Sequence, residues 1–438
     1  MLRRRAERRG RARGRATHDK TSAPSAGGQA LLHPETVAVG FGYDPQDAFG
    51  SIKPPMVMTS TFIYPSAQAA LDFHREFFAG EAAEGYIYAR LGHPNLAMVE
   101  ARMGALDGAE DCAGFNSGMA AASTVALAFA RAGETVLHSR PIYSGVDALV
   151  RGPLAEMGVR SEAISDACDE KAIRTAAEAA LKKGPLGLIL LESPANPTAA
   201  IADIALVRRI ADEIGKRPGR RPLISVDNTL LGPLRQSPLK EGADLTLTSL
   251  TKYCGGHSDL LAGSVSGGRE AIGKLKALRT ILGNHMAPFS AWLLLRSFES
   301  LAARQDRADA NAARIALFLA VHPKVQSVTW LGLLPERSAQ RAVYDRQCRG
   351  AGSTFSFTIH GGQAAAFRLL DALQLLKVAV SLGGSETLIC HPATTTHYQT
   401  PAGERAAGGV TDGTLRLSVG LEYPDDLIAD LARGLEEA

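Results

Sequence analysis

The chain of 438 residues lacks the features that define several protein classes. Its five cysteines, Cys112, Cys168, Cys254, Cys348 and Cys390, are odd in number, widely spaced and never in a C-x-x-C pair. They indicate neither a disulfide framework nor a zinc site, so we expect a reducing compartment, the cytoplasm. No stretch approaches the roughly 18 uninterrupted apolar residues needed to span a bilayer as a helix, and we therefore expect no membrane segment.

The composition is that of a folded protein. Hydrophobic residues make up 45% and charged residues 21%, which is ordinary for domains with large cores and excludes disorder as the main state. At roughly 100–200 residues per domain, the length predicts two or three domains. No internal repeat of 20–50 residues is apparent.

Positive charge is concentrated at the start of the chain. Residues 1–20 hold nine of the 48 basic groups and two of the 45 acidic ones, which leaves 39 basic and 43 acidic groups in the rest. Residues 1–30 have almost no apolar side chains and end in a Ser/Pro/Ala/Gly stretch, so we expect a disordered basic extension. It lacks the apolar segment of a secretory signal. Clustered arginines attract phosphates, so weak binding to polyanions is an alternative, although we do not expect a nucleic-acid partner.

Strand and helix patterns alternate after residue 30. Short apolar or β-branched runs predict strands, and amphipathic patterns between them predict helices. The runs cover residues 133–138, 186–193, 223–229 and 244–250, and two of the helical patterns cover 173–183 and 202–217. Near-continuous apolar strands that alternate with helices indicate a parallel sheet covered on both faces, an α/β fold. In such sheets ligands bind beyond the carboxyl ends of the strands.

Three polar segments point to a phosphate-bearing cofactor. Ser117 and Gly118 begin an Ala-rich helix, whose free N–H groups can bind a phosphate. Asp227 ends a buried strand and therefore needs a cationic partner, either a protein group or a protonated heterocycle. Lys252 lies beside Ser249 and Thr251, an arrangement that suits a Schiff base next to a phosphate. Each segment alone has a plain structural interpretation, but the three in this order indicate a pyridoxal 5'-phosphate site.

The sequence resembles one family of pyridoxal-phosphate enzymes over residues 35–438. The resemblance is carried by Y-I-Y-A-R-L-G-H-P-N (86–95), S-G-M-A-A (117–121), E-S-P-A-N-P-T (192–198), V-D-N-T (226–229), S-L-T-K-Y-C-G-G-H-S-D (249–259), S-L-G-G-S-E-T-L-I-C-H-P-A (381–393) and L-R-L-S-V-G-L-E (415–422). The family is that of Cys/Met metabolism, which includes cystathionine γ-synthase, cystathionine lyases, O-acyl-homoserine sulfhydrylases and methionine γ-lyase. The chain is most similar to the methionine γ-lyase-like members.

The resemblance implies a role for each candidate site residue. Lys252 would bind the cofactor covalently and carry protons, and Asp227 would pair with the pyridinium nitrogen. The cofactor contacts would be completed by Ser117, Gly118, Met119, Asn196, Thr229, Ser249 and Thr251, with Tyr88 and Arg90 reaching the phosphate of the neighbouring subunit. Each site would then need two chains, so we expect an obligate dimer, assembled further into a homotetramer.

The substrate end of the site follows from the same resemblance. Arg416 and Ser381 would hold the substrate carboxylate, for which a planar guanidinium is well suited. Tyr143 would stack on the cofactor ring and act as the acid for the leaving group. Val380 stands where members that act on cystathionine commonly carry Glu, and this favours a substrate without a second ammonium group, such as methionine.

Two positions depart from the family pattern. Ser144 and Gly145 follow Tyr143, whereas the family usually has Gly directly after this tyrosine, and methionine γ-lyases typically place Cys where Gly145 stands. Gly92-His93-Pro94-Asn95 replaces the usual x-N-P-T. Both changes concern the shape of the substrate pocket. A metal site is not expected, because His391 and His397 are six residues apart and no carboxylate or thiolate completes a set.

The expected architecture is the aspartate-aminotransferase-like fold, fold type I. Residues 31–92 would form an arm that contacts the partner subunit, 93–303 a large cofactor-binding domain and 304–438 a small α/β domain. The expected reaction is γ-elimination from an amino acid with a leaving group on Cγ, giving 2-oxobutyrate, ammonia and, from methionine, a thiol. The same residues would also serve γ-replacement, as in cystathionine γ-synthase or a sulfhydrylase, so that alternative stays open. Two further alternatives are β-elimination and a non-catalytic protein that binds polyanions.

Overall fold

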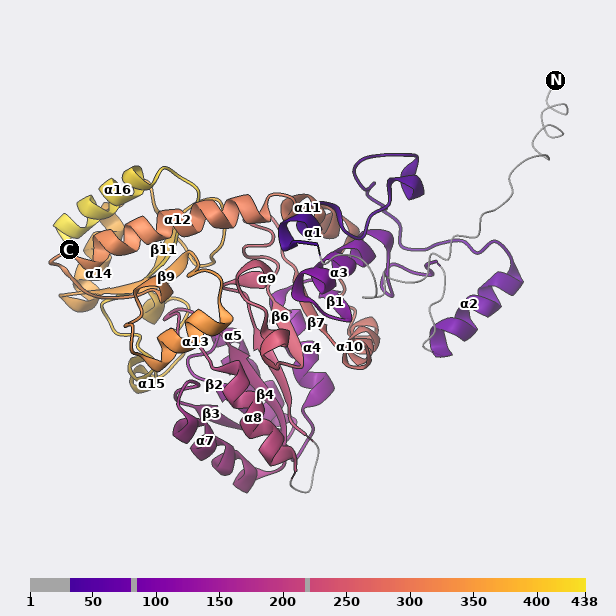
Figure 1. Cartoon of the computed structure of the whole chain (residues 1–438), viewed down its shortest axis with the longest axis horizontal. Coiled ribbons are helices and arrows are strands. Elements are labelled where there is room, and N and C mark those ends of the chain that lie inside the picture. Colours follow the sequence, from indigo (N-terminus) through magenta and orange to yellow (C-terminus); the bar gives the residue numbers. More distant parts are fainter. Residues whose placement is uncertain (1–31, 80–84, 217–220) are drawn as a thin grey trace.

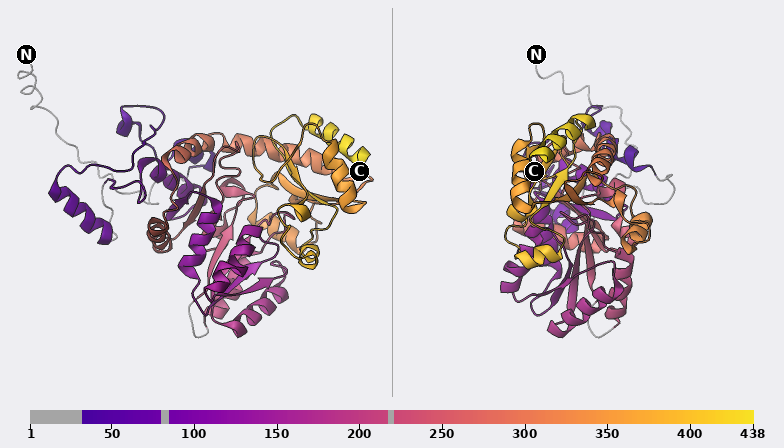
Figure 2. Two further views of the ribbon diagram at one scale, coloured as in Figure 1. Left: turned by 180° about the vertical axis from the view of Figure 1, so that it is seen from behind. Right: turned by 90° about the vertical axis from the view of Figure 1, so that its left-hand side faces the viewer.

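Two β-sheets, joined by one long helix, organise the molecule (Figures 1 and 2). The computed structural model describes residues 32–79, 85–216 and 221–438. The predicted basic extension, residues 1–30, lies outside these ranges. No helix in the described ranges is long and apolar enough to cross a membrane.

The larger sheet has seven strands in the order β1-β7-β6-β5-β4-β2-β3. Six strands run in one direction and β7 runs in the other. The predicted mostly parallel α/β sheet is therefore confirmed, and each of the four predicted strands overlaps an observed one. The strands are β1 (Asp111–Phe115), β2 (Thr135–Ser139), β3 (Arg160–Ile164), β4 (Leu186–Glu192), β5 (Leu223–Asp227), β6 (Leu245–Thr248) and β7 (Gly263–Gly267).

Helices cover both faces of this sheet. One apolar core packs α4, α5 and α10 against it, and a second packs α7 and α8 against the other face. A third core lies under α1, α3 and α11. The helices are α1 (Pro34–Gly40), α2 (Ala67–Ala79), α3 (Pro94–Asp107), α4 (Gly118–Phe129), α5 (Ser144–Arg151), α6 (Pro153–Glu156), α7 (Glu170–Lys183), α8 (Ile204–Gly215), α9 (Gly232–Arg235), α10 (Arg269–Leu282) and α11 (Pro288–Phe298).

The antiparallel strand β7 reads G-S-V-S-G, which resembles a turn more than a central strand. Gly263, the first residue of the strand, is explained by the close approach of a second backbone segment. A Cβ atom at Gly263 would lie 2.3 Å from the carbonyl oxygen of Ser117, so only glycine lets the start of α4 pack directly on the strand. This contact sets the position of the α4 N-terminus at the edge of the site.

The smaller sheet has five strands in the order β10-β11-β12-β9-β8 and its own apolar core. Helix α12 runs from the larger sheet region to this core (Figure 1). The strands are β8 (Val325–Thr329), β9 (Thr354–Ile359), β10 (Lys377–Val378), β11 (Leu388–Cys390) and β12 (Thr414–Ser418), and the helices are α12 (Leu301–Ala320), α13 (Ala339–Gln347), α14 (Gly362–Ala372), α15 (Ala402–Ala407) and α16 (Pro424–Glu437).

The segment before α3 differs from the rest of the fold in the exposure of its apolar side chains. Helix α2 lies away from both sheets in all views (Figures 1 and 2). Several of the large apolar side chains in this segment are exposed: Phe49, Ile52, Met58, Ile63, Leu71 and Tyr88. Within one chain, this segment therefore leaves apolar surface in water that the rest of the fold buries.

Candidate active site

The ends of β4, β5 and β6 bring the predicted cofactor residues together. Asp227 pairs in register with Glu192 on one side and Leu247 on the other. Its Oδ1 accepts the N–H of Thr229 at 2.9 Å, and the Thr229 hydroxyl accepts the N–H of Ser249 at 2.8 Å. Burial raises the pKa of Asp227 above its ordinary value, and the bonds from Thr229 oppose that shift. A cation placed against this carboxylate would offset the cost of burying it.

Lys252 follows β6 in the turn that closes this edge of the sheet. Its Nζ donates to the Ser381 hydroxyl at 2.7 Å, so the lysine reaches from the large sheet to the small-domain side. Burial, and next the Arg416 guanidinium, lower the Lys252 pKa to about 8. The amine is therefore uncharged far more often near neutral pH than an exposed lysine, as a nucleophile or base requires.

The N-terminus of α4 forms the second wall. Ser117 caps the helix, and its hydroxyl accepts the N–H of Ala120 at 3.0 Å. A Cβ atom at Gly118 would lie 2.8 Å from the Ser249 side chain, so glycine is needed for this close approach. Within the described ranges the N–H groups of Gly118 and Met119 have no acceptor. Free N–H groups at a helix N-terminus next to a serine hydroxyl fit a phosphate.

Arg416 is the deepest charged group of the site. It lies on β12 with 1% of its surface exposed, and it donates to the Asn196 side-chain oxygen at 3.2 Å and to the Ser381 carbonyl. In the described part of the chain no carboxylate pairs with it, and its Nε has no hydrogen-bond partner. A buried cation without a counter-ion is costly, and an incoming carboxylate would remove that cost.

The exposed side of the site carries Tyr143 and Val380. Tyr143 precedes α5 and is 40% exposed, and Val380 precedes Ser381 and is 54% exposed. A Cβ atom at Gly145 would lie 2.7 Å from the Tyr143 ring and 2.9 Å from the Met119 sulfur. The glycine thus leaves room for the tyrosine ring to lie over α5 and next to Met119.

The structure does not bring every predicted residue to the same place. Arg90 donates to the Thr280 carbonyl on α10 at 2.7 Å and lies 5.6 Å from the centre of the Tyr88 ring. Neither residue is bonded to Lys252 or Ser249 of the same chain in the described ranges. The Thr251 hydroxyl is engaged with the backbone of Ala262, from which it accepts at 3.0 Å. The phosphate contacts of Tyr88, Arg90 and Thr251 therefore stay predictions.

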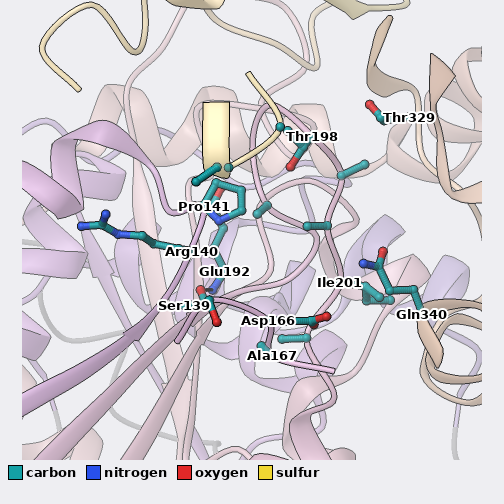
Figure 3. A pocket seen from close by; sticks show the side chains of 18 of the residues that line it. Ser139, Arg140, Pro141, Asp166, Ala167, Glu192, Thr198, Ile201, Thr329 and Gln340 are labelled. Carbon is teal, nitrogen blue, oxygen red and sulfur yellow. Dashed lines mark hydrogen bonds between the residues drawn. The ribbon is translucent and has the colours of Figure 1, made fainter. Parts of the chain in front are cut away.

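Glu192 is the last residue of β4, and no role was predicted for it. The side chain is 4% exposed, and its two oxygens accept the N–H groups of Tyr143 and Asn196 at 2.5 and 2.8 Å. It also lines a cavity of about 760 Å³ between the sheet ends and the small domain (Figure 3). An acidic residue that ends an otherwise apolar strand was the available signal.

The two histidines noted in the sequence differ in their contacts: both ring nitrogens of His391 are hydrogen-bonded, whereas the Nε2 of His397 has no partner in the described ranges. His391 is bonded to Thr394 and to the Asp412 carbonyl, and His397 to Thr396. Burial, then Arg416 and Arg405, lower the pKa of His397 to about 4. No group of three or more metal-ligating side chains occurs in the part of the chain that the structure covers.

Known proteins agree with this geometry. Residues 35–436 match the family described as Cys/Met metabolism PLP-dependent enzyme. The chain is 38% identical over 405 residues to the L-methionine gamma-lyase of Pseudomonas putida, covering 92% of this chain and 96% of that one. It is 35% identical over 379 residues to the O-succinylhomoserine sulfhydrylase of Pseudomonas aeruginosa, covering 86% and 89% of the two chains.

A solved structure is similar over the same length. The cystathionine gamma synthase of Xanthomonas oryzae pv. oryzae, solved in complex with aminoacrylate and cysteine, matches with a TM-score of 0.83 and 34% identity, covering 93% of this chain and 99% of that one. The predicted fold type I architecture, the dependence on pyridoxal phosphate and the reaction class, γ-elimination or γ-replacement, are thereby confirmed. The positions of Lys252, Arg416 and the α4 N-terminus agree with these matches. The chain belongs to the Cys/Met metabolism family of pyridoxal-phosphate-dependent enzymes.

Proposed function

We propose that this protein catalyses γ-elimination from methionine or a similar amino acid, yielding 2-oxobutyrate, ammonia and a thiol. The observation that carries the proposal is the buried, uncompensated Arg416 beside Lys252, because together they supply a carboxylate site next to a proton acceptor. The similarity to methionine γ-lyases supports the same reaction.

The residues present fit the cofactor. Lys252 would hold it covalently, Asp227 would pair with the ring nitrogen, and the N–H groups of Gly118 and Met119 with the Ser249 hydroxyl would hold the phosphate. When bound, pyridoxal phosphate supplies a ring that accepts the electrons released at the substrate Cα. Tyr143, Asn196 and Thr229 complete the proposed set around it.

The chain's own groups would move the protons. Arg416 and Ser381 hold the substrate carboxylate, which places Cα near Lys252 Nζ. With its pKa lowered to about 8, that amine removes the Cα proton and then helps to take one from Cβ. The Tyr143 hydroxyl gives a proton to the sulfur as the Cγ–S bond breaks. Water then releases 2-oxobutyrate and ammonia.

The alternative is γ-replacement, in which a nucleophile adds at Cγ in place of water-driven release. The same side chains would serve it, and similarity to a sulfhydrylase and a cystathionine γ-synthase keeps it in view. Val380 favours a substrate without a second ammonium group, such as methionine, because its exposed apolar side chain offers no partner for that group, and an O-acyl-homoserine would satisfy the same condition.

The proposal includes an assembly of identical chains in the cytoplasm. The exposed Tyr88, Arg90 and apolar side chains of residues 32–92 would lie against a second copy, forming a dimer and then a dimer of dimers. Residues 93–303 would act as the cofactor domain and 304–438 as the substrate-closing domain.

The test is a product assay on the full-length, cofactor-loaded protein. We expect 2-oxobutyrate and methanethiol from L-methionine, and lower rates from cystathionine and O-succinylhomoserine. Each substrate is run with and without an added thiol, and products are identified by mass spectrometry. Thiol adducts at Cγ in place of 2-oxobutyrate would show the replacement reaction. No product from any substrate, despite visible absorbance from bound cofactor, would overturn both.

A further inference from the structure

Glu192 lies where two site segments meet. It ends β4, its own N–H donates to the Ser139 hydroxyl at the end of β2 at 3.1 Å, and the neighbouring strand end is Asp227. One side-chain oxygen accepts the N–H of Tyr143 from the turn after β2, and the other accepts the N–H of Asn196 from the turn after β4. A single carboxylate thus joins two turns that carry separate parts of the site.

Each turn carries a group toward the substrate. Tyr143 brings the phenol proposed as the acid, and Asn196 accepts from Arg416, which is proposed to hold the substrate carboxylate. Glu192 therefore links the turn that carries Tyr143 to the turn that carries Asn196, the partner of Arg416, and so helps to set the distance between Tyr143 and Arg416. Because backbone N–H groups are the donors, the carboxylate fixes main-chain positions and, through them, the directions of both side chains.

The environment of Glu192 argues against a packing role. Burial first and Asp227 second raise its pKa to about 8, while the bonds from Asn196 and Tyr143 act in the opposite direction. The other charged groups at the same cavity are Asp166, Arg140 and Glu404, and the last two pair with each other (Figure 3). An apolar side chain here would leave the N–H groups of Tyr143 and Asn196 without their acceptor, so the costly burial of this acid is explained by the two bonds that it accepts.

We propose that Glu192 is a positioning residue of the reaction, which holds Tyr143 and Asn196 at the spacing that the substrate requires. This inference rests on the proposed function for the roles of Tyr143 and Arg416. It identifies no new contact between Glu192 and substrate, and it predicts that loss of the carboxylate disturbs both ends of the site at once.

Glu192→Gln is the main test. Glutamine has the same shape but only one acceptor oxygen, so its amide N–H₂ faces one of the two N–H donors. We expect the visible circular dichroism of the bound cofactor to change in the absence of substrate, because the Tyr143 ring shifts. With methionine at a pH above 8, where the acid is ionised, we expect kcat to fall roughly ten- to a hundred-fold and KM to rise several-fold, the scale of one lost charge-assisted bond.

Ser139→Ala is the matched control. It removes a bond at the same strand end and leaves the carboxylate with both of its donors. We expect a lower Tm, with the dichroism, kcat and KM within about two-fold of the wild type. Equal kinetic and spectroscopic changes in both variants, scaled to their loss of Tm, would mean that Glu192 is merely structural.

Glu192→Asp covers the case in which the glutamine variant fails to fold. It retains the acid but is one methylene shorter, so it reaches one donor and not both, and we expect smaller changes in the same direction. A folded, loaded variant of either kind with wild-type dichroism, kcat and KM overturns the proposal. The dichroism needs no substrate, so failure of the methionine assay in the wild type would refute the proposed function without deciding this test.

Discussion

The floor and the rim of the site are built in different ways. The floor consists of Asp227, Thr229, Ser249 and Lys252 at strand ends, where each side chain or its backbone is bonded within one chain. The rim consists of Tyr88, Tyr143 and Val380, which are 42%, 40% and 54% exposed. The floor can form in a lone chain, whereas the rim leaves apolar and aromatic surface uncovered. Under the proposed roles, cofactor binding depends on contacts within one chain, and substrate selection depends on surface that a second chain would cover.

The largest effect is expected at the floor. Lys252→Ala removes the amine that we propose binds the cofactor and carries the protons, so turnover should fall below detection. The protein should remain folded, because the lysine side chain makes one hydrogen bond, to Ser381, in the described ranges. Product assay and far-UV circular dichroism check the two halves of this prediction. Substantial activity in the folded variant would contradict the role of Lys252.

The second prediction tests whether Arg90 contributes to the active site of the neighbouring chain. Arg90→Ala should weaken cofactor binding about ten- to a hundred-fold, the effect of one charge-assisted bond of ~1.5–3 kcal/mol. When these chains are unfolded, mixed with Lys252→Ala chains and refolded, a mixed dimer contains one site with both groups. Activity at limiting cofactor should then return, although each parent alone stays impaired. No recovery in confirmed mixed dimers would place Arg90 in its own chain's site or in none.

The third prediction concerns selection at the rim. Val380→Glu places a carboxylate beside the substrate-carboxylate groups, where it can pair with the distal ammonium of cystathionine. An exposed pair contributes up to about 1 kcal/mol, so the preference for cystathionine over methionine should shift roughly five-fold. Competing-substrate assays measure the ratio directly, and Val380→Gln is the uncharged control. An equal shift in both variants would attribute the effect to size and polarity in place of charge.

The smallest effect tests burial away from the site. Asp107, at the end of α3, is 3% exposed, and burial raises its pKa to about 7. Its folded-state pKa lies above the unfolded value, so the carboxyl costs nothing below about pH 4 and increasingly destabilises the fold as pH rises to 7. Asp107→Asn should therefore raise Tm by a few degrees at pH 8 and by little at pH 4, with activity unchanged.

Calorimetry at both pH values checks this prediction, and the exposed Asp371→Asn is its control. A Tm gain that is the same at pH 4 and pH 8 would contradict the raised pKa. Burial also raises the pKa of Asp227, but replacing Asp227 should cost activity, because that carboxylate is proposed to pair with the cofactor.

The sequence predicted the residues of the floor, but it predicted neither strand β7 nor the contacts of Glu192. Apolar runs that end in polar residues mark β4, β5 and β6, so Asp227 and Lys252 could be placed together before the fold was known. Strand β7 was not predicted, because its sequence, G-S-V-S-G, has little strand propensity. The close approach of the Ser117 backbone requires the glycine at position 263. The position of Glu192 at a strand end could be predicted, but its two contacts could not. Its donors are backbone N–H groups, and the residue types do not indicate the direction of those groups.

The link between Lys252 and Ser381 has a consequence for how the protein is made. The two residues are 129 positions apart, and a ribosome that adds 5–20 residues per second needs roughly 6–26 s to pass from one to the other. Arg416 emerges later still, on the last strand of the small sheet. For that interval a nascent chain holds the lysine and aspartate of the floor but no group for the substrate carboxylate. If these residues have the proposed roles, the groups that hold the cofactor are synthesised before the groups that select an amino acid.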